Sequence, residues 1–160
     1  MLFADRVQDE LMITMRNYQM PFDREAAAVL LSQLGLSEKM EAYPRDLSTG
    51  ERQRTALGAI TIVHPGGLLL DEPTRGMDYA AKKALGDLLK RWREDSMSIL
   101  LVTHDVEFAA QCADRVMVLR EGTIQTEGEA RYVLSKEAGL CTQIAQLFPD
   151  QGWIIPEDVS

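Results

Sequence analysis

The chain has few cysteines, no long apolar run and no surplus of basic residues, and each absence excludes a class of protein. Cys112 and Cys141 are its two cysteines among 160 residues, so no disulfide framework is expected, and each is predicted to be a small buried side chain. The longest apolar runs, such as 26–31 and 99–102, fall short of the about 20 residues that cross a bilayer. The first residues also lack the basic region and apolar stretch of a secretory signal, so a cytoplasmic protein is expected.

The charge balance argues against nucleic acid as the main ligand. Lys and Arg number 17 against 25 Asp and Glu, which gives a net charge of −8. Binding to a phosphate backbone needs concentrated Lys and Arg, and neither half of the chain carries a basic patch. A nucleotide stays open as a ligand, because backbone N–H groups and a metal ion can hold its phosphates.

Hydrophobic spacing and cap residues divide the chain into helices and strands. Asp23 and Ser48 can cap helices whose apolar residues recur at helical spacing. The short apolar runs 68–70 and 98–103 predict strands that are buried on both faces. The predicted helices lie at 23–34, from 48 through 60, 79–94, 106–112 and 130–135, and the other predicted strands at 115–119 and 123–126. Beyond Gly139, proline and glycine predict an irregular docking segment rather than a helix.

This order of elements predicts an α/β fold. Strands that alternate with helices are typical of a sheet with parallel strands. The first 60 or so residues are helical instead and are expected to form a lobe of their own. We therefore divide the chain into a helical subdomain at 1–62, an α/β core at 63–136 and a C-terminal tail at 137–160.

Two neighbouring carboxylates follow directly on the strand 68–70. Asp71 and Glu72 stand where α/β sheets bind their ligands, beyond the carboxyl end of a strand. Adjacent residues of a strand point to opposite sides, so the two side chains can serve different purposes. One can hold a magnesium ion, usually through water, and the other can orient or deprotonate an attacking water. The alternative is a solvated loop that follows a strand.

A second candidate site opens the predicted helix that begins near Ser48. Ser48, Thr49 and Gly50 stand at its N-terminus, where free N–H groups and the helix dipole favour an anion. Gly50 would let a phosphate approach the backbone closely. The alternative is a capping box, in which Ser48 pairs with Glu51 three residues later.

His104 is the third candidate, because it ends the strand 98–103 in the sequence Thr103-His104-Asp105. A histidine there would share the edge of the sheet with Glu72 and could bond a phosphate oxygen or steer a water. The alternative is a structural histidine at a strand end. His64 has no comparable context and is interpreted as structural.

Together and in this order, these segments resemble the second half of the ATPase domain of ABC (ATP-binding cassette) transporters. The resemblance covers residues of about 3 to 135. Residues 47–53, LSTGERQ, are similar to the signature motif LSGGQ, with Thr49 and Glu51 as tolerated departures. Residues 68–72 look like the Walker B strand and its catalytic glutamate, 76–78 look like the D-loop, and His104 matches the switch histidine.

The resemblance implies a P-loop NTPase-like parallel sheet with flanking helices, in addition to an N-terminal α-helical lobe. That sheet would be incomplete, because the N-terminal strands of the family are missing here. ATP and Mg²⁺ are the implied cofactors. The implied roles are catalysis for Glu72 and His104, a magnesium ligand for Asp71, and nucleotide binding for Ser48, Thr49, Gly50, Glu51 and Asp78.

The resemblance also implies partners. Such cassettes work as head-to-tail dimers with a second ATPase cassette, identical, different or fused, and act on a transmembrane coupling component at the inner face of the cell membrane. Nucleic acid is not an expected partner. Residues 71–78, DEPTRGMD, are similar to the energy-coupling factor importers of vitamins and of transition metals such as cobalt.

One essential motif of this family is missing. No glycine of the chain is followed by lysine, so the phosphate-binding loop G-x-x-x-x-G-K-[ST] is absent. We therefore expect the chain alone to hydrolyse no ATP, and its sheet to have a poorly covered edge. Two other interpretations stay open: a truncated, catalytically silent module that only pairs with partners, and a non-transport relative that acts on DNA or ribosomes. The net charge of −8 and the short helical lobe argue against the latter.

Overall fold

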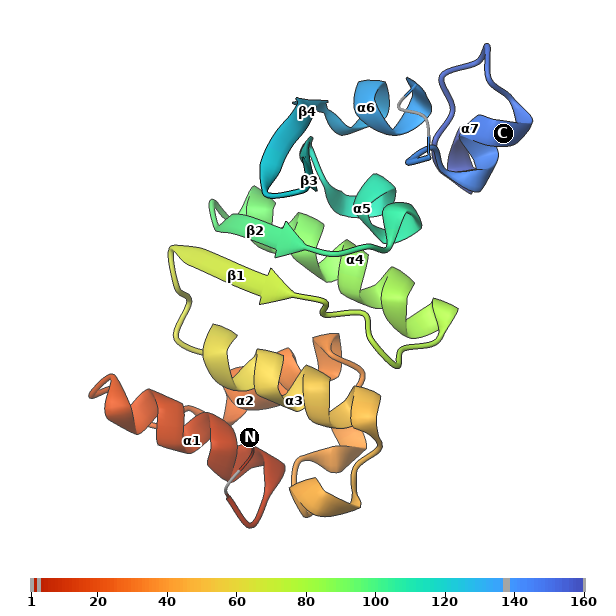
Figure 1. The fold of residues 1–160 in the computed structure, drawn as a ribbon. Coiled ribbons are helices and arrows are strands. Elements are labelled where there is room, and N and C mark those ends of the chain that lie inside the picture. The colour runs from red at the N-terminus through yellow and green to blue at the C-terminus, as the bar shows by residue number, and fades with distance from the viewer. Residues whose placement is uncertain (1, 3, 137–138, 160) are drawn as a thin grey trace. The chain divides into compact units, whose positions relative to one another are not determined.

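The computed structural model describes residue 2 and residues 4–136 and 139–159, and it divides into two compact units (Figure 1). Unit 1 comprises Met1–Leu69 and Arg75–Leu100, and unit 2 comprises Leu70–Thr74 and Leu101–Ser160. Residues 1, 3, 137, 138 and 160 lie outside the described part, including three of the predicted tail 137–160. Each unit is described by itself.

Unit 1 is mainly helical. Its α-helices are α1 (Val7–Asn17), α2 (Arg24–Gln33), α3 (Thr49–Thr61) and α4 (Tyr79–Glu94), and its short 3-10 turns are η1 (Ser37–Lys39) and η2 (Pro44–Asp46). The predicted caps are confirmed, since the Asp23 carboxylate accepts hydrogen bonds from the N–H groups of Glu25 and Ala26. The helix expected at 79–94 has these bounds in the structure.

Close contact between α2 and α3 explains a glycine inside a helix. A Cβ atom on Gly58 of α3 would lie 2.9 Å from Cδ1 of Leu34, which directly follows α2. A larger residue at position 58 would require the Leu34 side chain to move. The surrounding core includes fully buried Leu31 and Leu36 from the second helix and the turn that follows it.

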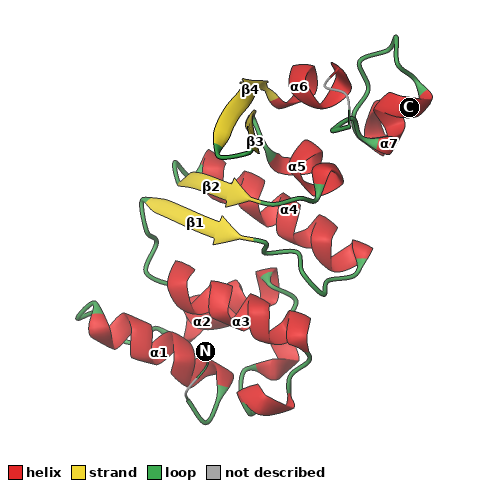
Figure 2. Ribbon diagram, viewed as in Figure 1, coloured by secondary structure: helices red, strands yellow, loops and turns green. Residues whose placement is uncertain are grey.

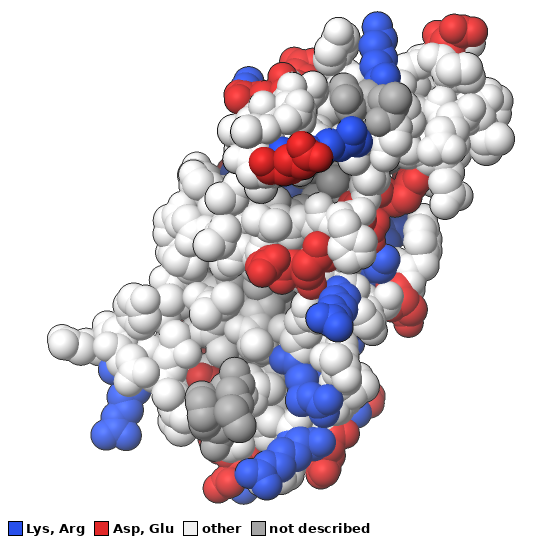
Figure 3. Space-filling model, in the orientation of Figure 1, with Lys and Arg blue, Asp and Glu red and all other residues white. Residues whose placement is uncertain are grey.

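The strands β1 (Gly67–Asp71) and β2 (Ser98–Val102) pair in a two-stranded parallel sheet, and α4 connects them (Figure 2). The prediction that these strands are buried on both faces was wrong. Leu68 and Leu70 are buried, but Leu69 is 67% exposed and Leu100 is 51% exposed. In the face drawn in Figure 3, the surface over the beginning of these strands carries no charged side chains. One face of this two-stranded sheet, which carries Leu69 and Leu100, is therefore not covered by the described residues.

Unit 2 contains an antiparallel hairpin between short helices. Its helices are α5 (Val106–Cys112), α6 (Ala130–Lys136), α7 (Gln143–Leu147) and the 3-10 turn η3 (Pro156–Val159). The strands β3 (Arg115–Arg120) and β4 (Thr123–Glu129) pair from Arg115 with Glu129 to Arg120 with Thr123. Glu121 and Gly122 both have positive φ angles, of 49° and 76°, as a two-residue hairpin turn requires.

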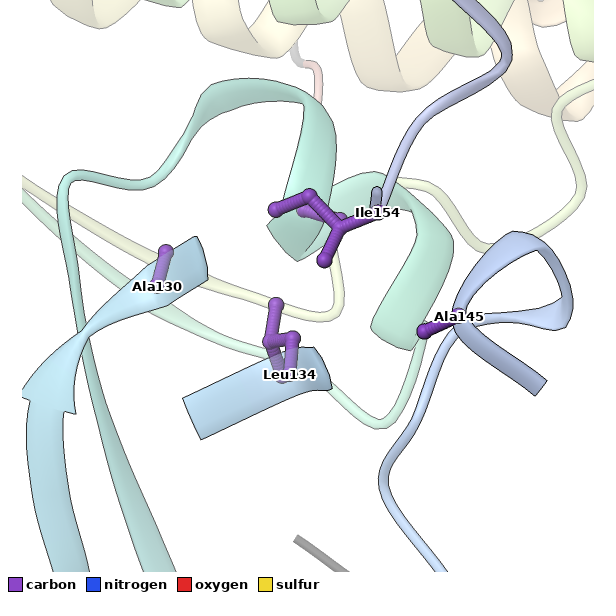
Figure 4. Close-up of a cluster of buried hydrophobic side chains, with 5 residues drawn as sticks. Ala130, Leu134, Ala145 and Ile154 are labelled. Carbon is purple, nitrogen blue, oxygen red and sulfur yellow. The ribbon is translucent and has the colours of Figure 1, made fainter. Parts of the chain in front are cut away.

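The tail folds back onto its own unit, and the expectation of a segment without helix was wrong. Thr142 caps α7, because its hydroxyl accepts a hydrogen bond from the N–H of Ala145. Figure 4 shows side chains of the tail and of α6 in one apolar cluster. The buried members of that cluster are Ala110, Ala130, Leu134, Ala145 and Ile154. The burial of Ala145 and Ile154 in this cluster decides where the tail lies, although proline and glycine between them favour turns.

Among the described residues, no helix combines the length and the hydropathy that a membrane crossing requires.

Candidate functional site

Glu72 and His104 form a hydrogen-bonded pair where β1 and β2 end. The Glu72 N–H donates to the carbonyl of Val102 over 2.8 Å, so the residue after β1 is fixed to the end of β2. Its Oε1 accepts a bond from the backbone N–H of His104 at 3.0 Å and lies 2.8 Å from Nδ1 of the same residue. Glu72 also has a φ of 46°, which is uncommon for a residue other than glycine. The structure thus places two of the predicted site residues in contact.

Thr103 is a third member of this group that the sequence analysis did not assign. Its hydroxyl donates to Oε2 of Glu72 over 3.5 Å and accepts from the N–H of Asp105 over 3.0 Å. The available signal was its place directly before His104 at the end of a strand.

These contacts lower the pKa of the Glu72 carboxyl from its ordinary value. The largest cause is the side-chain hydrogen bond from His104, and the backbone N–H of His104 and the hydroxyl of Thr103 act in the same direction. Donors that face a carboxylate stabilise its charged form. Glu72 is therefore a carboxylate at neutral pH, and it can accept a proton or hold a water molecule. The His104 ring is itself 89% exposed and can reach a ligand.

Replacing His104 with alanine is expected to raise the pKa of the Glu72 carboxyl toward its ordinary value, because the largest stabilising contact of the carboxylate is lost. A carbon-13 NMR titration of the glutamate carboxyls of the chain and of the His104→Ala variant measures this. His64→Ala is the matched control and should leave the pKa of Glu72 unchanged. An unchanged Glu72 titration in His104→Ala would contradict the pairing.

Asp71 is the last residue of β1, and it is exposed. In the described part of the chain, no three His, Cys, Asp or Glu side chains gather so that they could hold a metal ion. Magnesium in nucleotide sites usually takes one or two carboxylates and completes its octahedral shell with waters and phosphate oxygens. An exposed carboxylate such as Asp71 could supply one ligand of such a shell, and the described residues do not supply the others.

The N-terminus of α3 has the capping box that was the alternative interpretation. The Ser48 N–H donates to Oε2 of Glu51 over 2.8 Å, and the Glu51 N–H donates to Oγ of Ser48 over 3.3 Å. The backbone N–H of Ser48 is the largest cause that lowers the pKa of the Glu51 carboxyl, and Lys39, at 3.4 Å, adds to it. The capping box uses the N–H groups of Ser48 and Glu51, so an anion at this helix end would have to be held by those of Thr49 and Gly50.

The predicted D-loop residues lie beside this helix end. A Cβ atom on Gly50 would lie 3.6 Å from the carbonyl oxygen of Gly76, and one on Gly76 would lie 3.8 Å from Cγ2 of Thr49. Asp78 caps α4, since its Oδ1 accepts from the N–H of Ala81 over 2.8 Å. Both distances at Gly50 and Gly76 are ordinary contacts, so packing alone does not require a glycine at position 50. A close approach by a ligand would explain it.

The two groups offer complementary chemistry. Glu72 with His104 supplies a proton acceptor and an exposed imidazole, which together can position a water molecule. The end of α3 supplies backbone N–H groups and a dipole that favour phosphate oxygens. Neither group contains a loop that could cradle the phosphates of a nucleotide, because the sequence has no G-x-x-x-x-G-K-[ST] motif.

Comparison with known proteins gives consistent matches. A family model described as ABC transporter matches residues 1–75. Energy-coupling factor transporter ATP-binding protein EcfA2 of Latilactobacillus sakei subsp. sakei is 33% identical over 169 residues, which cover 98% of this chain and 58% of EcfA2. Aliphatic sulfonates import ATP-binding protein SsuB 1 of Rhizobium johnstonii is 46% identical over 101 residues, or 62% of this chain and 37% of SsuB 1.

The fold matches as well. The structure of CbiO1 from Clostridium perfringens, part of the ABC transporter complex CbiONQ, superposes with a TM-score of 0.70 at 26% sequence identity. That match covers 84% of this chain and 55% of CbiO1. The mixed α/β fold is thus that of ABC ATPase chains. The chain spans only part of the length of its curated relatives. It covers 58% of EcfA2, 37% of SsuB 1 and 20% of a further relative from Streptomyces avermitilis.

Proposed function

We propose, from the premise that this chain carries part of the ATPase domain of ABC transporters, that it acts in the ATP-binding subunit of an importer. The observation that carries the proposal is the Glu72–His104 pair at the ends of β1 and β2, at 2.8 Å. It gives a carboxylate and an imidazole at the position where α/β sheets bind ligands. In this role Glu72 accepts a proton from the attacking water, His104 holds the carboxylate in place, and Asp71 is one ligand of Mg²⁺.

ATP would supply the phosphoryl group and Mg²⁺ would neutralise its charge. The residues of this chain can hold only part of the nucleotide. The chain offers the hydroxyl of Ser48 and the N–H groups of Thr49 and Gly50 at the end of α3, with Glu51 and Asp78 stabilising the two helix ends. A second cassette is proposed to contribute the phosphate-binding loop that faces them. The functional unit is then a head-to-tail dimer that closes on ATP and reopens after hydrolysis.

The finer assignment is an importer of the energy-coupling factor type, for vitamins or transition metals. It is supported by the alignment with EcfA2, which covers 98% of this chain and thus includes the tail, whereas the alignment with SsuB 1 covers 62%. A transmembrane coupling component would dock on the helical lobe, at the cytoplasmic face of the membrane. Exposed apolar side chains on α1, such as Met12 and Ile13, are consistent with such a contact.

The test is ATP-dependent pairing with a complete cassette. EcfA2 of Latilactobacillus sakei, impaired in hydrolysis by replacement of its own catalytic glutamate, is mixed with this chain, and complex formation is followed by light scattering after size-exclusion chromatography. A one-to-one complex is expected only with MgATP. Gly50→Arg should abolish it, because the side chain would fill the space in which the phosphates approach α3.

Gly66→Arg is the matched control, since a Cβ atom there would have no neighbour within 4 Å. It should leave the complex intact. Complex formation without nucleotide, or equal loss in both variants, would contradict the proposed sandwich.

A further inference from the structure

Arg54 is a cation of α3 that has no counter-ion among the described residues. Its Nε is buried without a hydrogen-bond partner, and its guanidinium forms no ion pair there. Arg52 on the same helix differs, because it donates to the carbonyl of Leu47 and to Oγ1 of Thr49. A guanidinium stays charged in proteins and has N–H donors but no acceptor. Arg54 therefore still needs an oxygen acceptor, and no described residue supplies one.

The Arg54 guanidinium lies beside the helix end that we propose for the nucleotide. Arg54 follows Gly50 by one turn of α3, and helix side chains lean toward the N-terminus. Its Nη1 is 3.9 Å from the point that a Cβ atom of Gly50 would occupy. The carbonyl oxygen of Gly76 is 3.6 Å from the same point, where the residues that lead into α4 pass the beginning of α3 (Figure 1). Because position 50 is a glycine, no side chain there separates the guanidinium from a ligand at the helix end.

The carboxylates at this helix end are already engaged, whereas its donors are not. Glu51 is bonded within the capping box, and Asp78 caps α4. The N–H groups of Thr49 and Gly50 donate to no acceptor in the described part of the chain, as is usual in the first turn of a helix. The unpaired Arg54 side chain is a separate observation that points in the same direction. Donors without acceptors therefore come together at the beginning of α3.

We propose that Arg54 is a further phosphate-binding residue of this chain, whose guanidinium turns onto an oxygen of the nucleotide at the end of α3. One phosphate group can accept from several donors at once, so the N–H groups of Thr49 and Gly50 and the guanidinium can share it. The movement breaks no hydrogen bond, because Arg54 makes none with the described residues. The inference rests on the proposed function, in which a second cassette presents the nucleotide.

A carboxylate of the second cassette is the other group that could pair with Arg54. A carboxylate has two oxygens, which match the fork of one guanidinium. It would then leave the N–H groups of Thr49 and Gly50 without an acceptor. A phosphate accounts for all of these donors together, so the acceptor is assigned to the nucleotide.

The first measurement uses the chain alone, with inorganic tripolyphosphate as the probe. Spectra of the ¹⁵N-labelled chain record the amide signals of Thr49 and Gly50 and the Nε–H signal of Arg54. Tripolyphosphate is expected to shift all of them, and this readout requires no substitution. Arg54→Gln should weaken its binding at least about tenfold, and Arg54→Lys, which keeps the charge without the fork, should have an intermediate affinity.

The matched control is Arg91→Gln. It removes the same charge from an exposed position near the C-terminal end of α4. Because solvent and salt screen exposed charges, it should bind tripolyphosphate as the unchanged chain does. The amide spectra of all variants should match that of the unchanged chain away from the substituted residue, which shows that the fold is intact.

The second measurement is the dissociation constant of the MgATP-dependent complex with the hydrolysis-impaired EcfA2. Arg54→Gln should raise this constant about 10-fold to 100-fold, the range for one lost hydrogen bond to a charged group. Arg54→Lys should restore part of the affinity. Arg91→Gln should leave the constant unchanged.

Three results would overturn the inference. They are unshifted Thr49 and Gly50 signals in tripolyphosphate, equal binding by Arg54→Gln and Arg91→Gln, and a loss of pairing in Arg54→Gln without a loss of tripolyphosphate binding. The last result would assign the acceptor of Arg54 to the protein of the second cassette. If the unchanged chain forms no complex with EcfA2, the proposed function fails, whereas the tripolyphosphate titration still decides whether Arg54 binds phosphate.

Discussion

When the chain is purified by itself and supplied with ATP and Mg²⁺, phosphate is expected to form no faster than in the same buffer without protein. Catalysis of phosphoryl transfer depends almost entirely on positioning and on charge stabilisation around the phosphates. This sequence contains no G-x-x-x-x-G-K-[ST] loop to provide either. The Glu72–His104 pair, although already assembled, then has no oriented phosphate to act on. A phosphate-release assay over several hours, with and without EDTA, measures this.

Activity is expected to appear when the missing loop is supplied. A composite chain joins the segment of EcfA2 that precedes the aligned region to the first residue of this sequence. This composite should hydrolyse MgATP, and Glu72→Gln should lower its rate by about 100-fold to 10,000-fold, the range for loss of a general base. Glu107→Gln, which changes the same kind of side chain on α5, is the control and should keep most of the rate.

Three results would count against this account. Magnesium-dependent turnover by the unmodified chain, abolished by Glu72→Gln, would mean that the phosphates are held in a way that the sequence motifs do not reveal. A composite chain that folds, binds ATP and is unaffected by Glu72→Gln would remove Glu72 from the reaction. A composite that binds other subunits but never turns over would favour the catalytically silent module instead.

The local structure of this chain could be predicted well from the sequence. The helix over Tyr79–Glu94 has a capping aspartate before it and apolar residues at helical spacing, and both signals act within a few residues. The hairpin at Glu121-Gly122 depends on positive φ angles, which a glycine signals. The placement of Glu72 and His104 at one edge of the sheet also followed, because the carboxyl ends of neighbouring parallel strands meet there, whereas their direct hydrogen bond was not predicted.

Burial and the tail could not be predicted in the same way. Leu69 and Leu100 read as core residues, but whether a strand is covered depends on chain segments far away in the sequence. The sequence of the tail predicts an irregular segment, because its prolines and glycines favour turns over the few residues around them. Its position is decided by Ile154, which is 3% exposed, and by an ion pair with α6 across 27 residues. Contacts at such separations leave no periodic pattern in a single sequence.

Removing the Asp158 carboxylate is expected to release the tail from α6 and to destabilise unit 2. Oδ1 and Oδ2 of Asp158 accept hydrogen bonds from the two terminal nitrogens of Arg131, at 2.9 and 3.0 Å. Oδ2 also accepts from the N–H groups of Ile154 and Ile155. These donors, Arg131 first, lower the pKa of the Asp158 carboxyl to about 2 from an ordinary 3.8. The side chain is 15% exposed, so solvent screens these contacts only in part.

The pKa shift gives the size of the effect and its pH dependence. One pKa unit corresponds to about 1.4 kcal/mol, and Arg131 is half exposed, so the contribution after screening is about 1–2 kcal/mol. Because the folded pKa lies below the unfolded one, this stability is fully present above about pH 4. It is lost as the pH falls from about 4 to about 2, where the carboxyl of the folded chain takes up its proton.

The measurement uses the fluorescence of Trp153, which precedes Ile154 and packs edge-on against Phe148 with ring centroids 5.2 Å apart. With Trp92→Phe as background, Trp153 is the one remaining tryptophan and reports on unit 2. Asp158→Asn should lower the free energy of unfolding by about 1–2 kcal/mol at pH 7 and leave a much smaller difference at pH 2. Asp150→Asn, an exposed aspartate of the same tail, is the control and should behave as the background does. If Asp158→Asn unfolds like this control at pH 7, the contact between Arg131 and Asp158 does not hold the tail, and the buried Ala145 and Ile154 must do so alone.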